Sequence, residues 1–208
     1  MSYVVKSEQA RAAALGFWPG PIDGVRGART QAAIAAATRA QREKGRPFIH
    51  DSGLTRIHLH WTAGGYHPSA LDKRSYHLLI DGDGDVLRAN DPRVRLAHTL
   101  NANGGAIAVS LCAMAGARER PFDKGTAPIL AIQLAAMVRA AASLCRDFDI
   151  PVDRYSVLTH AEVQPTLGIK QRGKIDICWI PGMEAMGNPI EVGDRLRAMI
   201  ARALRGVS

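Results

Sequence analysis

The feature that most constrains the fold is a change of pattern near residue 47. Residues 3–40 contain two alanine-rich, helix-favouring stretches around the turn FWPGPIDGVRGART, and the polar run Gln41–Pro47 is typical of a linker. Short apolar segments then follow at strand spacing: RIHLHWTA, YHLLIDGDGDVLRA and AIAVSLCAM. We therefore expect a small helical unit over residues 1–45 and a main domain over residues 46–208.

Within the main domain, strands alternate with helices. The turn sequence Asp81–Gly84 predicts a hairpin, since Asp-Gly pairs favour tight turns. Apolar residues at helical spacing predict a long helix over residues 128–148, and YSVLTH predicts a strand ending in His160. Residues 190–207 form an amphipathic pattern, with Arg195, Arg197, Arg202 and Arg205 largely outside its apolar side. The order predicts an α/β fold, a central mixed β-sheet flanked by helices.

Composition limits the partners and the compartment. The net charge of +8 and the pI of about 9.9 favour an anionic partner. Aromatic residues make up only 5%, without the basic aromatic stretches that stack on bases, so we do not expect nucleic-acid binding. Three widely spaced cysteines indicate thiols made in a reducing compartment. The first residues lack a signal-peptide pattern, so we expect synthesis in the cytoplasm and release by another route.

Several ligand-type residues stand at candidate strand ends. In IHLHWTAGG, alternation places His58 and His60 on one face, away from the apolar residues, so either ring can reach a metal. His160 ends the strand YSVLTH, and Asp176 and Cys178 follow in KIDICW. Two imidazoles with one carboxylate or thiolate leave an open position on tetrahedral zinc, which is typical of a catalytic site. Asp176 and Cys178 remain alternatives for the third ligand.

Four blocks resemble, in order, the zinc N-acetylmuramoyl-L-alanine amidases of phage endolysins and peptidoglycan-recognition proteins. These blocks, which span residues 50–182, are IHLHWTA, SYHLLIDGDGDV, LAHTLNANGGAIAVSL and LTHAEVQPTLGIKQRGKID. The resemblance implies that His60, rather than His58, is the first zinc ligand and that His160 is the second. The spacing from Lys174 favours Asp176 as the third, with Cys178 as the minority alternative.

The same resemblance implies roles for other side chains. Tyr76 would orient the attacking water and Lys174 would stabilise the developing oxyanion, while either could donate a proton to the leaving amine. His98 and Asn101 would bind substrate. Because Glu162 is close in sequence to His160, it is expected to orient an imidazole N–H from behind. The chain departs from the family in lacking the glutamate that some members carry on the strand AIAVSLCAM.

The N-terminal segment LGFWPGPIDGVRGARTQAAIAAA resembles the small three-helix peptidoglycan-binding domain over residues 5–40. In this segment Thr30 is expected to cap the helix that follows. The alternative is a helical hairpin that only packs on the main domain.

Together these patterns predict a monomeric zinc amidase that binds and cuts bacterial peptidoglycan, as a phage or prophage endolysin acting on the cell wall after release. The basic C-terminal helix either contacts the anionic envelope or packs on the sheet with its arginines in water. A non-catalytic peptidoglycan-recognition module and a cytosolic amidase that recycles wall fragments are the alternatives. Their distinguishing features would be a lost zinc ligand and the absence of a wall-binding unit.

Overall fold

The apolar segments of the main domain form one five-stranded sheet. The computed structural model describes residues 3–44 and 53–206. In chain order these residues form α1 (Tyr3–Ala14), α2 (Ala28–Glu43), β1 (Arg56–Trp61), α3 (Ala70–Ser75), β2 (Leu78–Ile80), β3 (Val86–Arg88), β4 (Ala106–Leu111), α4 (Ala131–Asp147), β5 (Val157–Thr159), α5 (His160–Leu167) and α6 (Pro189–Leu204). The strand order is β3-β2-β4-β1-β5; the β2–β3 pair is antiparallel and the other pairs are parallel. The predicted mixed α/β sheet is confirmed.

The central strands β1 and β4 are buried along their whole length. Ile57, Leu59 and Trp61 of β1 belong to the main apolar core, which also contains residues of α4 and α6. Side chains alternate along a strand, so His58 and His60 project from the opposite face. They meet other polar side chains there. The alternation expected from the sequence therefore separates an apolar face from a face that carries the chemistry.

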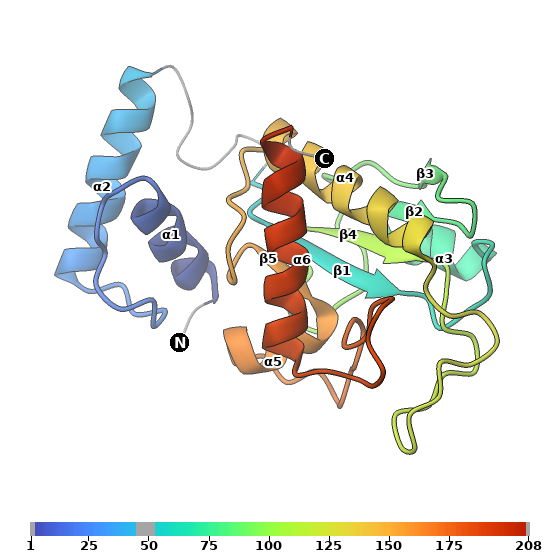
Figure 1. Cartoon of the computed structure of the whole chain (residues 1–208). Coiled ribbons are helices and arrows are strands. Elements are labelled where there is room, and N and C mark those ends of the chain that lie inside the picture. The colour runs from blue at the N-terminus through green and yellow to red at the C-terminus, as the bar shows by residue number, and fades with distance from the viewer. Residues whose placement is uncertain (1–2, 45–52, 207–208) are drawn as a thin grey trace.

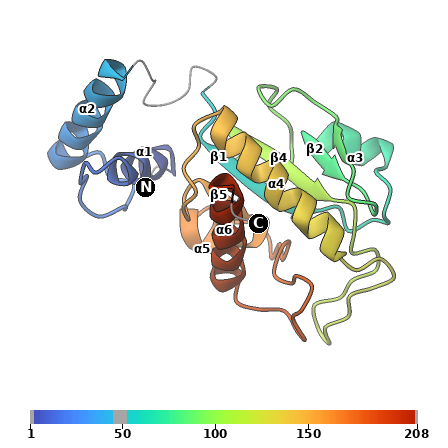
Figure 2. The same ribbon diagram turned by 45° about the horizontal axis from the view of Figure 1, so that its top comes forward.

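Helices α4 and α6 lie side by side on the apolar face of the sheet (Figures 1 and 2). Leu134 and Met137 of α4 and Leu196 and Ile200 of α6 are buried in the core. The two long helices predicted from periodicity are thus confirmed. Ile132, which fits the same periodic set, is instead 52% exposed.

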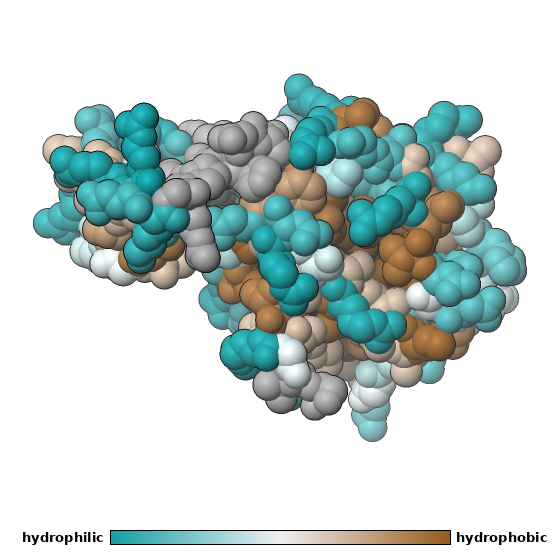
Figure 3. Space-filling view, turned by 90° about the horizontal axis from the view of Figure 1, so that it is seen from above, coloured by the Kyte–Doolittle hydropathy of each residue, from teal (hydrophilic) through white to brown (hydrophobic). Residues whose placement is uncertain are grey.

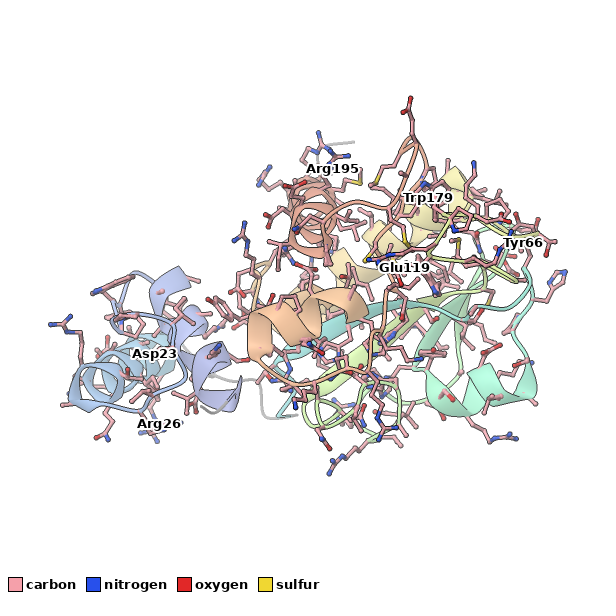
Figure 4. All side chains as sticks on the ribbon, turned by 90° about the horizontal axis from the view of Figure 1, so that it is seen from below. Asp23, Arg26, Tyr66, Glu119, Trp179 and Arg195 are labelled. Atoms are coloured by element: carbon pink, nitrogen blue, oxygen red, sulfur yellow. The ribbon has the colours of Figure 1, made fainter. Side chains whose placement is uncertain are left out.

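The N-terminal helices α1 and α2 form a hairpin beside the main body (Figure 1). The buried side chain of Gln9 in α1 holds the connecting loop: its amide donates to Asp23 and to Thr30 at 3.0 and 3.1 Å. Its carbonyl oxygen accepts from the amide of Gly24 at 2.9 Å. Figure 4 shows Asp23 and Arg26 in this loop. Hydrophilic residues cover most of the hairpin seen from above, whereas hydrophobic residues gather over the main body (Figure 3).

Two details of the N-terminal prediction are corrected by the structure. Thr30 does not cap α2, because that helix begins two residues earlier and Gly27 stands at its N-cap without a side-chain bond. The hydroxyl of Thr30 instead donates to the carbonyl of Pro19 at 3.0 Å and closes the loop. The predicted linker begins later than expected, since α2 continues to Glu43. Its remaining residues, 45–47, lie outside the described part of the chain.

Side-chain contacts join the N-terminal hairpin to the main body. Arg11 of α1 pairs with the carboxylate of Asp149 and donates to its backbone oxygen at 2.7 Å. Lys6 donates to the backbone oxygen of Thr166, in α5, at 3.2 Å. The hairpin is therefore anchored close to α5, the helix that begins at His160.

In the described residues, no helix has the length and apolar character that a membrane span requires.

The C-terminal helix is locked to the sheet by a buried ion pair. Arg197 of α6 donates to Glu162 of α5 at 2.7 Å and to the backbone oxygen of Val157 in β5 at 2.7 Å. Arg197 is 6% exposed and Glu162 is fully buried. This corrects the prediction that Arg197 lies on the outer side of the helix. Arg195, Arg202 and Arg205 are exposed, as expected.

Gly193 allows this ion pair to form. A Cβ atom at Gly193 would collide with the carboxylate of Glu162. We expect Gly193→Ala to destabilise the fold by about 2 kcal/mol, because the overpacking penalty exceeds the gain in helix propensity. The midpoint of thermal unfolding should fall by about 5 °C. Gly65→Ala is the matched control, since nothing lies within 4 Å of its added Cβ. Equal midpoints for the two variants would contradict this account.

Candidate metal centre

The pairing of β1 with β5 brings two of the expected ligands together. The strands are parallel, and Leu59 of β1 lies opposite Thr159 of β5. His60 and His160 are the next residues, so they stand side by side at the carboxyl ends of neighbouring strands. Their ring centroids are 4.7 Å apart. His160 is the first residue of α5 rather than the last of a strand, because Thr159 caps the helix at this point.

Asp176 completes the group from the segment that follows α5. Its backbone oxygen accepts from the amide of Ala161 at 2.6 Å, which ties this segment to the start of α5. Its Oδ2 atom lies 3.0 Å from His60 Nδ1 and 3.1 Å from His160 Nδ1. All three side chains are buried. Their ligand atoms lie within 4.8 Å of one another, so they could hold a metal ion.

The electrostatics of this group suit a cation. Burial lowers the pKa of His60 to about 4, so its ring is neutral near pH 7. Burial acts to raise the pKa of Asp176, but hydrogen bonds with His160 and His60 outweigh it and hold that pKa below its usual range. A neutral imidazole and an ionised carboxylate are the forms in which these groups bind metals. Two imidazoles and one carboxylate fit an open tetrahedral zinc site.

Cys178, the alternative third ligand, lies apart from this group. Its thiol is buried, and burial raises its pKa to about 12, which keeps it protonated. Within the described residues, two sets of ligand-type atoms converge, one of His60, His160 and Asp176 and another of His58, His60 and His98. Neither set includes Cys178. The geometry therefore favours Asp176.

The second set surrounds a buried hydroxyl. Thr99 Oγ1 lies 3.1 Å from His58 Nδ1, 2.8 Å from His98 Nδ1 and 3.4 Å from His60 Nε2. Burial lowers the pKa of His58 well below its usual range and that of His98 to about 2, so both rings are neutral. The amides of His98 and Thr99 donate to Asn103 Oδ1 at 3.2 and 2.7 Å. Thr99 and Asn103 thus fix the loop that carries His98.

Tyr76 and Lys174 both lie near the ligands. The ring of Tyr76 is tilted over His60, with centroids 5.3 Å apart. Burial and then the charge of Asp176 raise the pKa of Tyr76, so its hydroxyl stays protonated. The charge of Lys174 contributes to lowering the pKa of His60. His77, next to Tyr76, accepts from the amide of Ala108 at 2.8 Å and so has a structural role.

A pocket of about 380 Å³ opens beside the ligands. Its lining comprises Arg95, Ala97, His98, Thr99, Leu100, Asn101, Asn103, His160, Gln171, Arg172 and Lys174. Both residues predicted to bind substrate, His98 and Asn101, therefore line the pocket. Three cationic side chains and no carboxylate are among its lining residues, so the pocket is suited to an anionic group.

The structure gives Glu162 a different place from the one expected. Its carboxylate bonds to Arg197 and to the amide of Thr159, at 2.7 and 2.8 Å, and supports the start of α5 instead of an imidazole. The side chain that bonds to His160 is Gln171, whose Oε1 lies 3.0 Å from His160 Nε2. Sequence reasoning missed Gln171 and Thr99, because an amide and a hydroxyl carry no recognisable metal-site pattern.

The chain matches the model of a known protein family. A family model described as N-acetylmuramoyl-L-alanine amidase matches residues 29–176. No curated protein is similar enough in sequence to count as a match.

Among solved structures, similarity extends to an endolysin of the Thermus scotoductus bacteriophage Ph2119, with 18% identity, 57% of this chain and 78% of that chain covered, and a TM-score of 0.43. Drosophila peptidoglycan recognition protein SD has 21% identity, with 66% of this chain and 88% of that chain covered and a TM-score of 0.42. The N-acetylmuramoyl-L-alanine amidase LysC of Clostridium intestinale has 14% identity, with 76% of this chain and 91% of that chain covered and a TM-score of 0.44.

The family match extends over well over half of the chain and includes His60, His160 and Asp176. On this basis the chain belongs to the N-acetylmuramoyl-L-alanine amidase family, whose members act on peptidoglycan.

Proposed function

We propose that this protein is a zinc-dependent hydrolase of the amide bond between N-acetylmuramic acid and the L-alanine of the stem peptide. The observation that carries the proposal is the buried convergence of His60, His160 and Asp176 beside a pocket, in a chain of the amidase family. The reaction adds water across the amide and yields a carboxylate on the lactyl group and a free amino terminus on L-alanine.

In this proposal His60, His160 and Asp176 hold the zinc ion. When bound, zinc supplies Lewis acidity that polarises the amide carbonyl and makes water more acidic. Tyr76 orients the attacking water with its protonated hydroxyl. Lys174, on the rim of the pocket, stabilises negative charge that develops on the carbonyl oxygen. Tyr76 and Lys174 are the two candidates to protonate the leaving amine.

The pocket beside the ligands is the proposed substrate-binding cleft, with His98 and Asn101 among its contacts. Arg95 and Arg172 add positive charge at its rim. Stem peptides carry free carboxylates, which guanidinium groups bind through charge-assisted hydrogen bonds. The cleft is therefore matched to the peptide side of the scissile bond.

The N-terminal hairpin is proposed to be a wall-binding unit. Trp18 and Val25, in the loop between α1 and α2, are 66% and 53% exposed. An exposed aromatic ring beside a loop held by buried hydrogen bonds offers a flat apolar surface to a sugar face. The net charge of +8 adds a general attraction to acidic wall polymers, which suits a lytic role as a phage or prophage endolysin.

The first prediction from this proposed function concerns the metal. His60→Ala, His160→Ala and Asp176→Ala should each lose stoichiometric zinc and reduce the release of L-alanine amino termini from purified peptidoglycan by at least about 1,000-fold, because an open site cannot be held by two ligands. A chelator should abolish activity of the unchanged protein, and added zinc should restore it. Reducing sugar, measured in parallel, should not increase.

Cys178→Ser is the matched control for Asp176→Ala. It should retain zinc and most of the activity, since the thiol lies outside the convergent ligand group. Loss of zinc in Cys178→Ser, with retention in Asp176→Ala, would reverse the ligand assignment. Zinc binding without release of amino termini from any wall type would instead favour a recognition module.

The second prediction separates chemistry from metal binding. Tyr76→Phe and Lys174→Ala should each lower kcat by about 100-fold, the usual effect of removing one transition-state donor, while zinc content stays at one equivalent. Lys170→Ala removes a positive charge that is close in sequence but outside the pocket lining, and should change kcat by less than about threefold. Equal losses in Lys170→Ala and Lys174→Ala would show that general charge, rather than position, is responsible.

The third prediction tests the cationic rim. Arg172→Ala should raise KM about 10-fold for stem peptides with free carboxylates, because one charge-assisted hydrogen bond contributes about 1.5 kcal/mol. The KM for the corresponding carboxamide peptides should change little. Arg202→Ala is the matched control, because it removes an exposed arginine of α6 that does not line the pocket. An equal rise of KM for both peptide classes would exclude carboxylate recognition by Arg172.

A further inference from the structure

Gln171 makes an unusual set of contacts for a residue of the connecting segment after α5. Its side chain is 3% exposed. The amide nitrogen Nε2 donates to the backbone oxygen of Leu100 at 2.8 Å and to that of Ile169 at 3.3 Å. The oxygen Oε1 lies 3.0 Å from Nε2 of His160. The backbone amide of Gln171 donates to Gln164 Oε1, in α5, at 2.9 Å.

These contacts determine which end of the amide faces His160. A side-chain amide has two N–H donors at its nitrogen and only acceptors at its oxygen. Both donors of Gln171 are used by backbone oxygens, which cannot donate. The reverse orientation would place the amide oxygen against two carbonyl oxygens. Oε1 therefore faces the ring of His160 and can only accept a proton from it.

The consequence is a fixed tautomer for His160. Because Gln171 Oε1 can only accept, it stabilises a hydrogen on Nε2 of His160 and leaves Nδ1 as the ring atom for a metal ion. Nδ1 of His160 also faces an acceptor, Asp176 Oδ2 at 3.1 Å, and a metal ion bound there would take the place of a hydrogen on Nδ1. Nδ1 of His60 lies 3.0 Å from the same oxygen. With a metal ion at Nδ1, a hydrogen on Nε2 is the arrangement of the His160 ring that keeps the hydrogen bond to Gln171.

The other ligand histidine has a less specific partner. Nε2 of His60 lies 3.4 Å from the hydroxyl of Thr99, which also contacts His58 and His98. A hydroxyl both donates and accepts, so Thr99 does not by itself determine the tautomer of His60. Gln171 therefore constrains the tautomer of His160 more strongly than Thr99 constrains that of His60.

We propose that Gln171 is a positioning residue that sets the tautomer and orientation of His160 for metal binding. Through Leu100 it also connects this ligand to the loop that lines the substrate pocket. The inference rests on the proposed zinc site. Partners behind metal-binding histidines typically change metal affinity 10- to 100-fold when removed.

The test compares three variants by their zinc dissociation constants, measured in competition with a chromophoric chelator. Gln171→Met keeps the length of the side chain but removes the acceptor, and zinc affinity should fall about 10- to 100-fold. Gln171→Glu keeps an acceptor for His160 and loses both donors to Leu100 and Ile169. It should bind zinc at least about fivefold more tightly than Gln171→Met, although its unfolding midpoint should fall.

Gln164→Ala is the matched control, because it removes the partner of the Gln171 backbone without touching the imidazole. Its zinc affinity should stay within about twofold of the unchanged protein. All measurements are made well below the unfolding midpoint of each variant, determined by circular dichroism. Unchanged zinc affinity in Gln171→Met, or equal losses in Gln171→Met and Gln171→Glu, would overturn the proposal and leave Gln171 as a structural brace.

A spectroscopic measurement addresses the tautomer directly. Proton–nitrogen correlation spectra of the imidazole rings of the zinc-loaded protein should show His160 with its hydrogen on Nε2 and none on Nδ1, and in Gln171→Met this Nε2 hydrogen should exchange faster with water. An Nδ1–H tautomer in the unchanged protein would overturn the inference. Failure of the unchanged protein to bind zinc would contradict the proposed function itself, which keeps the two failures distinguishable.

Discussion

The parallel pairing of β1 with β5 is the constraint on which the site depends. With Leu59 opposite Thr159, the next residue of each chain segment is a histidine at the same edge of the sheet. Because strand side chains alternate with a period of two, a shift of one residue would turn His60 toward the apolar core. The apolar residues of β1, which pack with α4 and α6, therefore hold the histidines in register.

The start of α5 holds His160 in place beside His60. Thr159 and Glu162 form a reciprocal cap, and the buried ion pair of Glu162 with Arg197 ties the cap to α6. A buried carboxylate left without its partner is strongly destabilising, so the pair makes the position of α5 specific. The C-terminal helix thus contributes to the site through Arg197, which bonds to Glu162 and to the backbone of Val157.

Around the ligands, polar side chains hold one another and the nearby backbone. Asn103 accepts from the amides of His98 and Thr99, the hydroxyl of Thr99 lies among three imidazole rings, and Gln171 joins His160 to Leu100. In a buried site each such bond is stronger than in water, and an unpaired group is correspondingly unfavourable. The result is a set of metal-ligand side chains, held by several hydrogen bonds, beside a cationic pocket.

The sequence by itself determined the α/β class, the β2–β3 hairpin and the two long helices, because periodicity and turn chemistry are local. It also indicated His60 and His160 through recognisable blocks, but left Asp176 and Cys178 as alternatives until the structure brought Asp176 to the two histidines. Only the tertiary structure decided that Thr30 lies inside α2, that Arg197 is buried, and that Gln171 rather than Glu162 contacts His160. These outcomes depend on contacts between segments that are far apart in the sequence. The role of an amide or a guanidinium group is set by those contacts, and its neighbours in the sequence do not show whether it will be buried and bonded or exposed to water.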